Sequence, residues 1–82
     1  MMKESKELLK EAGRDENGII SKKELLGWLS IRTNGKEFVD QKNARSKALW
    51  KAVMDDLEKD GLIEDGSGIG TVYFVTHKGY SV

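Results

Sequence analysis

Residues 44–60 read ARSKALWKAVMDDLEKD and are followed by Gly61. The apolar positions of this run recur at helical spacing, which predicts an amphipathic helix. Gly61 supplies the left-handed residue that ends such a helix, and Leu62 is placed to pack back on Leu57. We therefore expect a helix from near Gln41 to Asp60. Its apolar stripe consists of Leu49, Trp50, Val53, Met54 and Leu57.

Two β-like segments follow this helix. Residues 62–65 read LIED, residues 66–70 read GSGIG, and residues 71–76 read TVYFVT. Short β-rich runs on either side of a glycine-rich turn predict an antiparallel hairpin.

The first part of the chain predicts a helix and a short strand. Residues 3–12 place apolar side chains at helical spacing, and Gly13 follows as a stop signal. Residues 18–20 read GII, a short β-like segment. The apolar stripe of this first helix is Leu8, Leu9 and Ala12.

The next segment carries a capping-box pattern. Ser21 is followed three residues later by Glu24, which is typical of a helix start. We expect a second helix from Lys22 to about Ser30. Residues 34–35 read NG, a turn signal, and residues 38–39 are expected to anchor the connection to the core. The inward-facing residues of the second helix are expected to be Leu25, Leu26, Trp28 and Leu29.

The predicted order is helix, strand, helix, helix, strand, turn, strand. Its most specific pieces are GIISKKEL at residues 18–25, LEKDGLIE at 57–64 and YFVTHKG at 73–79. This pattern resembles the winged helix-turn-helix DNA-binding superfamily over about residues 5–80. The resemblance implies an α+β fold with three helices and a small antiparallel hairpin wing. The connection 33–40 is longer than the tight turn usual in that family.

The resemblance implies that the third helix is a recognition helix of a small DNA-binding protein. Such a protein would be a transcriptional regulator or an accessory protein of a bacterial phage or mobile element. Between Asp40 and Lys47 the only apolar residue is Ala44, so this half is unsuited to a core. Arg suits guanine, Asn and Gln suit adenine, and Lys and Ser suit phosphate. The predicted DNA-binding residues are Gln41, Lys42, Asn43, Arg45, Ser46, Lys47 and Lys51.

Charge is segregated along a chain with 14 basic and 14 acidic residues. Residues 41–54 hold four basic residues and no acid, whereas residues 55–65 hold six acids and one lysine. A basic start and an acidic end are the reverse of the charge order that the helix dipole favours. Because this order is unfavourable for the helix itself, it favours a functional role for the basic start. An ordinary solvated helix face is the alternative interpretation.

Length and composition restrict the function. The 82 residues allow one domain, which we expect to span residues 1–82. With no cysteine, disulfides and thiolate zinc sites are excluded and a cytoplasmic location is expected. No run is apolar enough for a membrane span. With one His and no phosphate-binding glycine loop before a helix, we expect neither an enzyme nor a cofactor.

Residues 13–24, GRDENGIISKKE, also resemble an EF-hand calcium loop. Asp15 would take the third position and Glu24 the twelfth, but Gly13 stands where the first carboxylate is needed. The capping box already explains Glu24. We therefore expect no metal site.

Two function classes remain from the sequence. The first binds duplex DNA, with affinity that falls steeply with salt and is weakened by Lys47→Glu. The second is a winged-helix module that binds a protein, favoured by the zero net charge and the uncharged turn at residues 66–70. The oligomeric state stays open.

Overall fold

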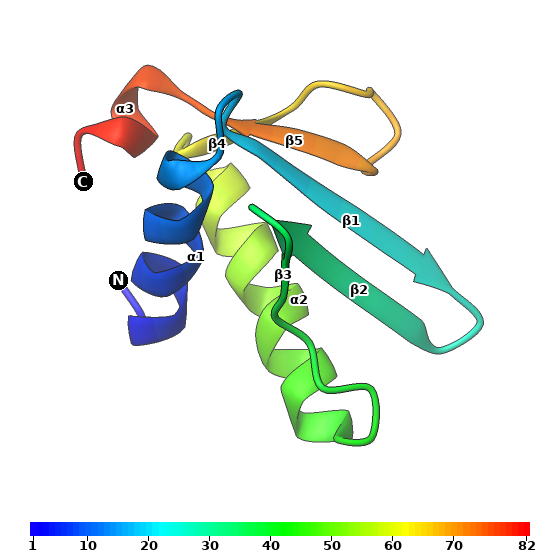
Figure 1. The fold of residues 1–82 in the computed structure, drawn as a ribbon. Helices are drawn as coiled ribbons and strands as arrows, with labels where there is room; N and C mark the ends of the chain where they lie inside the picture. The colour runs from blue at the N-terminus through cyan, green and yellow to red at the C-terminus, as the bar shows by residue number, and fades with distance from the viewer.

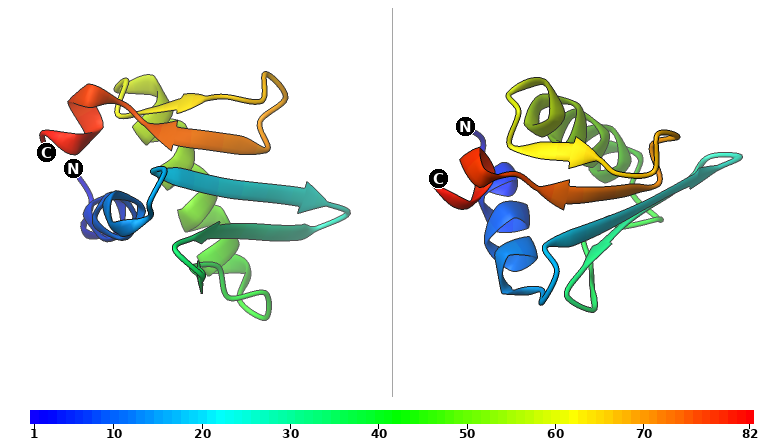
Figure 2. Two further views of the ribbon diagram at one scale, coloured as in Figure 1. Left: turned by 45° about the horizontal axis from the view of Figure 1, so that its top comes forward. Right: turned by 90° about the horizontal axis from the view of Figure 1, so that it is seen from above.

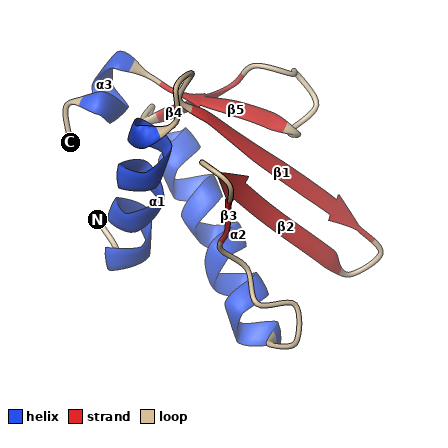
Figure 3. Ribbon diagram, in the orientation of Figure 1, coloured by secondary structure: helices blue, strands red, loops and turns tan.

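The computed structural model describes all 82 residues as three helices and five strands (Figure 1). All strand pairs are antiparallel, and the strand order across the sheet is β3-β2-β1-β5-β4 (Figure 3). The predicted α+β class is therefore confirmed. In chain order the elements are α1 (Lys3–Arg14), β1 (Ile19–Leu25), β2 (Trp28–Thr33), β3 (Lys36–Glu37), α2 (Ala44–Lys59), β4 (Ile63–Asp65), β5 (Val72–Val75) and α3 (His77–Tyr80).

The sheet has one covered and one open face. In the left view of Figure 2, α2 crosses behind β5, β1 and β2, and no helix lies in front of them. Along β2 the inward residues Leu29, Ile31 and Thr33 are buried, whereas the alternate residues Trp28 and Arg32 are exposed and Ser30 is half-buried. This alternation is expected of a strand with one face on the core. The inward positions and the stripes of α1 and α2 form one core of 15 buried residues.

The helix α2 confirms the sequence prediction, except that it begins at Ala44 and not near Gln41. Asn43 is its N-cap, because its side chain accepts hydrogen bonds from two backbone amides of the first turn. Gly61 has a φ of +73°, and its amide donates to the Glu58 carbonyl while the Leu62 amide donates to the Leu57 carbonyl. These two bonds form the Schellman motif that the glycine predicted.

The predicted second helix, Lys22 to Ser30, is wrong. Residues 19–33 form the β1–β2 hairpin, with Leu25 paired to Trp28 across a two-residue turn. Both turn residues, Leu26 and Gly27, have positive φ, +46° and +84°. This is the backbone of a type I′ turn, which matches the twist of paired strands.

The hairpin also reverses the predicted burial of this segment. Leu29 is buried as expected, but Leu25, Leu26 and Trp28 are exposed, with Leu26 at 99%. The capping-box pattern is a local signal only. It was outweighed by pairing of β1 with both β2 and β5, which buries Ile20 and Ile31 in the core.

The long connection between β2 and α2 contains the predicted turn at Asn34–Gly35, whose φ angles are +51° and +75°. A short strand, β3, follows it. The Phe38 ring packs edge-on against Trp50, with 5.2 Å between ring centroids, and Val39 is buried. The prediction that residues 38–39 anchor this connection is confirmed.

The C-terminal hairpin β4–β5 is confirmed, and it is followed by α3, which the sequence did not predict. Residues of the closing YFVTHKG segment cap the C-terminal end of α2. The Thr76 hydroxyl donates to the Gly61 carbonyl at 2.6 Å, and Lys78 Nζ donates to the Asp60 carbonyl at 2.9 Å. A cation at this end also suits the helix dipole. The Lys78 side chain therefore stabilises the C-terminal end of α2.

Candidate nucleic-acid interface

The seven residues predicted to bind DNA lie at or before the first half of α2, but the structure uses five of them for internal contacts. Gln41 donates to and accepts from the backbone of Leu29, which ties the connection to β2. Asn43 caps α2, and the Ser46 hydroxyl accepts from the Asp40 amide at 3.1 Å. Side chains held in this way are not free to read base edges.

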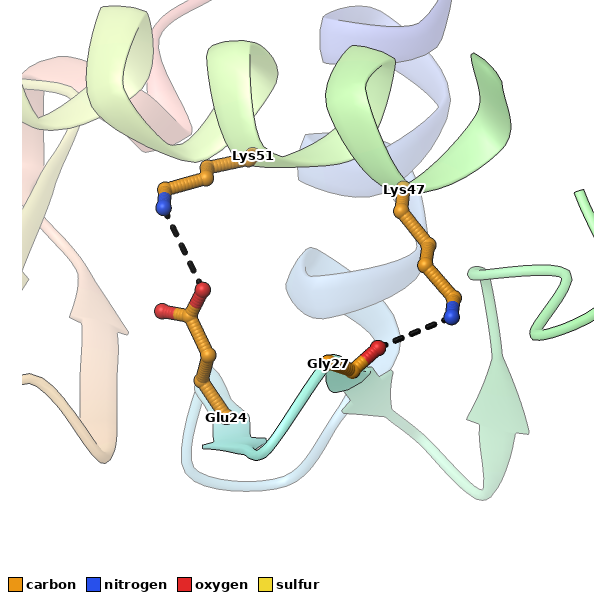
Figure 4. A network of polar contacts seen from close by, with 4 residues as sticks. All are labelled: Glu24, Gly27, Lys47 and Lys51. Atoms are coloured by element: carbon orange, nitrogen blue, oxygen red, sulfur yellow. Dashed lines mark hydrogen bonds and ion pairs between the residues drawn. The ribbon is translucent and has the colours of Figure 1, made fainter. Parts of the chain in front are cut away.

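Two lysines of α2 point toward the β1–β2 hairpin (Figure 4). Lys47 Nζ lies 2.8 Å from the Gly27 carbonyl oxygen, and Lys51 Nζ lies 3.2 Å from a Glu24 carboxylate oxygen. The Lys51 and Glu24 side chains are 55% and 47% exposed, so solvent screens the pair, and its strength is about 0–1 kcal/mol. A phosphate can replace such a partner at little cost.

The other two predicted residues, Lys42 and Arg45, are exposed, and their side chains make no hydrogen bond or ion pair. Lys42 follows directly on Gln41, so it is fixed close to the Trp28 end of β2. Because these two cations have no internal partner, they are available to an external anion.

Tertiary structure gathers the segregated charge into one end of the molecule. Residues 17–54 contain eight of the 14 basic residues and three of the 14 acidic ones, a net charge of +5. They form β1, β2, β3 and most of α2. The contacts of Gln41, Lys47 and Lys51 join that part of α2 to the hairpin. We call this unit the basic end; the rest of the chain carries the compensating −5.

The open face of the sheet at the basic end was not anticipated from the sequence. Trp28 is 52% exposed there, and the cross-strand register places Ser21 beside Arg32 and Lys23 beside Ser30. A shallow cavity of about 560 Å³ opens on this face. The alternating pattern WLSIRT at residues 28–33 was the signal that could have revealed it. The cavity is lined by Ser21, Lys22, Lys23, Trp28, Ser30, Arg32, Glu37 and Thr71.

The glycine-rich turn between β4 and β5 is closed around a carboxylate. The Asp65 side chain accepts hydrogen bonds from the Ser67 hydroxyl and from the amides of Ser67, Gly68 and Gly70. The Ser67 bond is the largest cause of a lowered Asp65 pKa, and the backbone amides lower the pKa further against a partial loss of solvation. These turn amides already donate to the Asp65 carboxylate, so they are not available to a phosphate, and they surround a negative charge.

Residues 13–24 do not close around a common centre as an EF-hand loop would. The Asp15 carboxylate accepts from the amides of Asn17 and Ile19, which turns the chain from α1 into β1. Glu24 lies near the far end of β1, about 17 Å along the strand from Ile19. These two carboxylates therefore serve separate parts of the fold.

None of the helices is both long and apolar enough to cross a membrane. Comparison with protein-family models, curated protein sequences and solved structures found no match to this chain.

Proposed function

We propose that this protein binds nucleic acid through its basic end, with duplex DNA as a ligand of the exposed start of α2. The observation that carries the proposal is the concentration of a +5 charge in one continuous unit of a neutral protein. Neutralised phosphates supply most of the affinity of such complexes. A neutral protein with one basic end can also orient itself in the field of a polyanion.

The contacts available at α2 favour phosphate binding over base reading. Lys42 and Arg45 are exposed and have no internal partner, so both are available to phosphate. Gln41 and Asn43, the residues suited to adenine, are held by the backbone of Leu29 and by the α2 N-terminus. We therefore expect little sequence preference from this half of the helix.

The order α2, β4, β5 has the same sequence of elements as the third helix and hairpin of the winged-helix pattern, and this part of the resemblance supports the proposal. The β1–β2 hairpin occupies the sequence position of the family's second helix. It covers the Lys47 and Lys51 side of α2, so DNA would approach from the side of Lys42 and Arg45. The turn of the β4–β5 hairpin contributes no cation, because residues 66–71 contain no Lys or Arg. It is also organised around the Asp65 carboxylate.

A protein-binding module is the second candidate function. It is favoured by two exposed apolar residues in the turns of the two hairpins, Leu26 at 99% and Ile69 at 80% exposure.

Salt-dependent binding of a labelled duplex tests the DNA proposal. For each phosphate contact removed, the slope of log affinity against log salt should fall by about 0.9. The double variant Lys42→Ala/Arg45→Ala should therefore reduce the slope by about 1.8. Lys10→Ala removes an exposed, unpaired cation from α1 and is the matched control, with no change expected. Lys47→Glu is less informative, because Lys47 also holds the hairpin.

An unchanged slope in the double variant would exclude this end of α2 as the contact. Failure of the wild-type protein to bind duplex at low salt would leave the protein-binding function as the better candidate. In that case Leu26 and Ile69 are the first positions to label.

A further inference from the structure

The open face of the sheet carries a second group of unpaired cations beside an exposed aromatic ring. We propose that this face binds single-stranded nucleic acid, with one base stacked on Trp28 and the backbone held by Lys23 and Arg32. The site goes beyond duplex binding at α2, since it uses a different surface and a different form of the ligand.

Strand register places these side chains together. Trp28 and Arg32 both point to the open face of β2, about 13 Å apart along the strand. Lys23 lies on the neighbouring strand, paired with Ser30 between them. Aromatic residues that stack bases and cations that follow the backbone are the two parts of single-strand binding surfaces.

The cations of this face have no competing partner. Lys23 and Arg32 are exposed, and their side chains form no hydrogen bond or ion pair. The one acid lining the cavity, Glu37, stands opposite Arg32 in the strand register but forms no ion pair with it. It accepts from the Ser30 hydroxyl and from the amides of Ile31 and Val39.

The cavity suits a nucleotide better than an apolar group. Its volume of about 560 Å³ lies within the range of small-ligand sites, roughly 300–1,000 Å³. Trp28 is its single hydrophobic residue, and hydroxyls and cations form most of the remaining lining. A flat π-face surrounded by hydroxyls and positive charge matches a base with its sugar and phosphate. On the same face Leu25 pairs with Trp28 and is 61% exposed. The other exposed apolar residues of this face, Ile19, Val72 and Phe74, lie toward the opposite end of β1.

Trp28 also provides the readout. A short labelled oligothymidylate at low salt should bind the wild-type protein and quench the emission of the exposed Trp28, whereas Trp50 is buried in the core. Loss of one stacked base predicts that Trp28→Ala binds about 5- to 150-fold more weakly. Trp28→Phe should retain most of the affinity. Ile69→Ala, an exposed apolar residue on the other hairpin, is the control and should bind like the wild type.

A second variant keeps the test valid if Trp28→Ala fails to fold. Lys23→Ala/Arg32→Ala changes two exposed side chains without internal contacts, and should reduce the single-strand salt slope by about 1.4. Lys10→Ala should leave it unchanged. The proposal is overturned if Trp28→Ala folds and binds the oligothymidylate as tightly as the wild type, or if Lys23→Ala/Arg32→Ala does so. It is also overturned if the wild-type protein does not bind the oligothymidylate.

The two sites can fail separately. Lys42→Ala/Arg45→Ala should weaken duplex binding but leave the affinity for the oligothymidylate within about twofold of the wild type. The reason is that the base stacks on Trp28, which lies on the sheet and not on α2. If that double variant instead abolishes single-strand binding while Trp28→Ala has no effect, the open-face site is wrong and α2 binds both ligands.

Discussion

Replacing Leu26 by Asn should stabilise this protein, although it exchanges a large apolar side chain for a small polar one. Leu26 is 99% exposed, so the substitution removes no packing. Its φ of +46° places it in the left-handed region, which is unfavourable for most L-residues and tolerated by Asn. Asn followed by Gly is also the preferred pair for a type I′ turn, and Gly27 already follows.

The size of the effect follows from the backbone. The left-handed conformation costs an ordinary residue about 1–2 kcal/mol. Substitution by Asn lowers this conformational cost in part but does not remove it. We expect the free energy of unfolding to rise by about 0.5–1 kcal/mol. For a domain of this size, 1 kcal/mol shifts Tm by about 4–8 °C. The expected increase in Tm is therefore about 2–8 °C.

Thermal and urea unfolding, followed by circular dichroism, measure this change. Leu26→Ala is the matched control, because Ala keeps the left-handed penalty and loses the same exposed side chain. It should stay within about 0.5 kcal/mol of the wild type. Leu29→Ala, which truncates a buried residue of the same hairpin, should instead cost about 2–5 kcal/mol.

The sign of the Leu26→Asn effect decides between hairpin and helix for this segment. In the helix predicted from the sequence, Leu26 faces inward, and its replacement would cost about 2 kcal/mol or more. A lower Tm for Leu26→Asn would therefore refute the type I′ turn and the hairpin that depends on it.

Substitutions at Gly79 and Asp65 test the C-terminal half, and a substitution at Gly13 in α1 provides a comparison. A Cβ at Gly79 would lie 2.1 Å from the backbone oxygen of Leu62, so Gly79→Ala should lower the free energy of unfolding by about 1–3 kcal/mol; Gly13→Ala, in open space on α1, should raise it by about 0.5–1 kcal/mol. A neutral result at Gly79 in the same unfolding assay would contradict the close approach of α3. Because the folded-state pKa of Asp65 is lowered from its ordinary value of 3.8, its contribution to stability is present above that pH and is lost as pH falls through the lowered pKa. Asp65→Asn should therefore show a smaller loss of Tm than the wild type on acidification below 3.8, and equal losses would argue against the hydrogen-bonded turn.

The candidate site shows how far single residues can be interpreted without a structure. Lys42 and Arg45 were identified correctly as exposed cations, because a polar run at a helix start cannot enter a core. Gln41 is held by the unpaired backbone groups of Leu29, and Asn43 is held because α2 begins directly after it. Neither contact can be predicted from the residue types alone. Trp28 was assigned to the core for a different reason: its segment was predicted to be a helix with Trp28 facing inward, whereas in the hairpin it lies on the open face.

The sequence by itself determined the elements whose signals are local and complete. The stripe of α2, the glycine at its C-terminus, the Asn34–Gly35 turn and the β4–β5 hairpin each follow from residues close to one another in the chain. Tertiary structure alone decided residues 21–30, where a capping-box pattern and an alternating strand pattern compete. Pairing of β1 with both β2 and β5 gives the strand two hydrogen-bonded neighbours and a buried face, whereas a helix there would gain only a local cap. The same choice exposed the open face of the sheet and brought the basic residues of distant segments to one end.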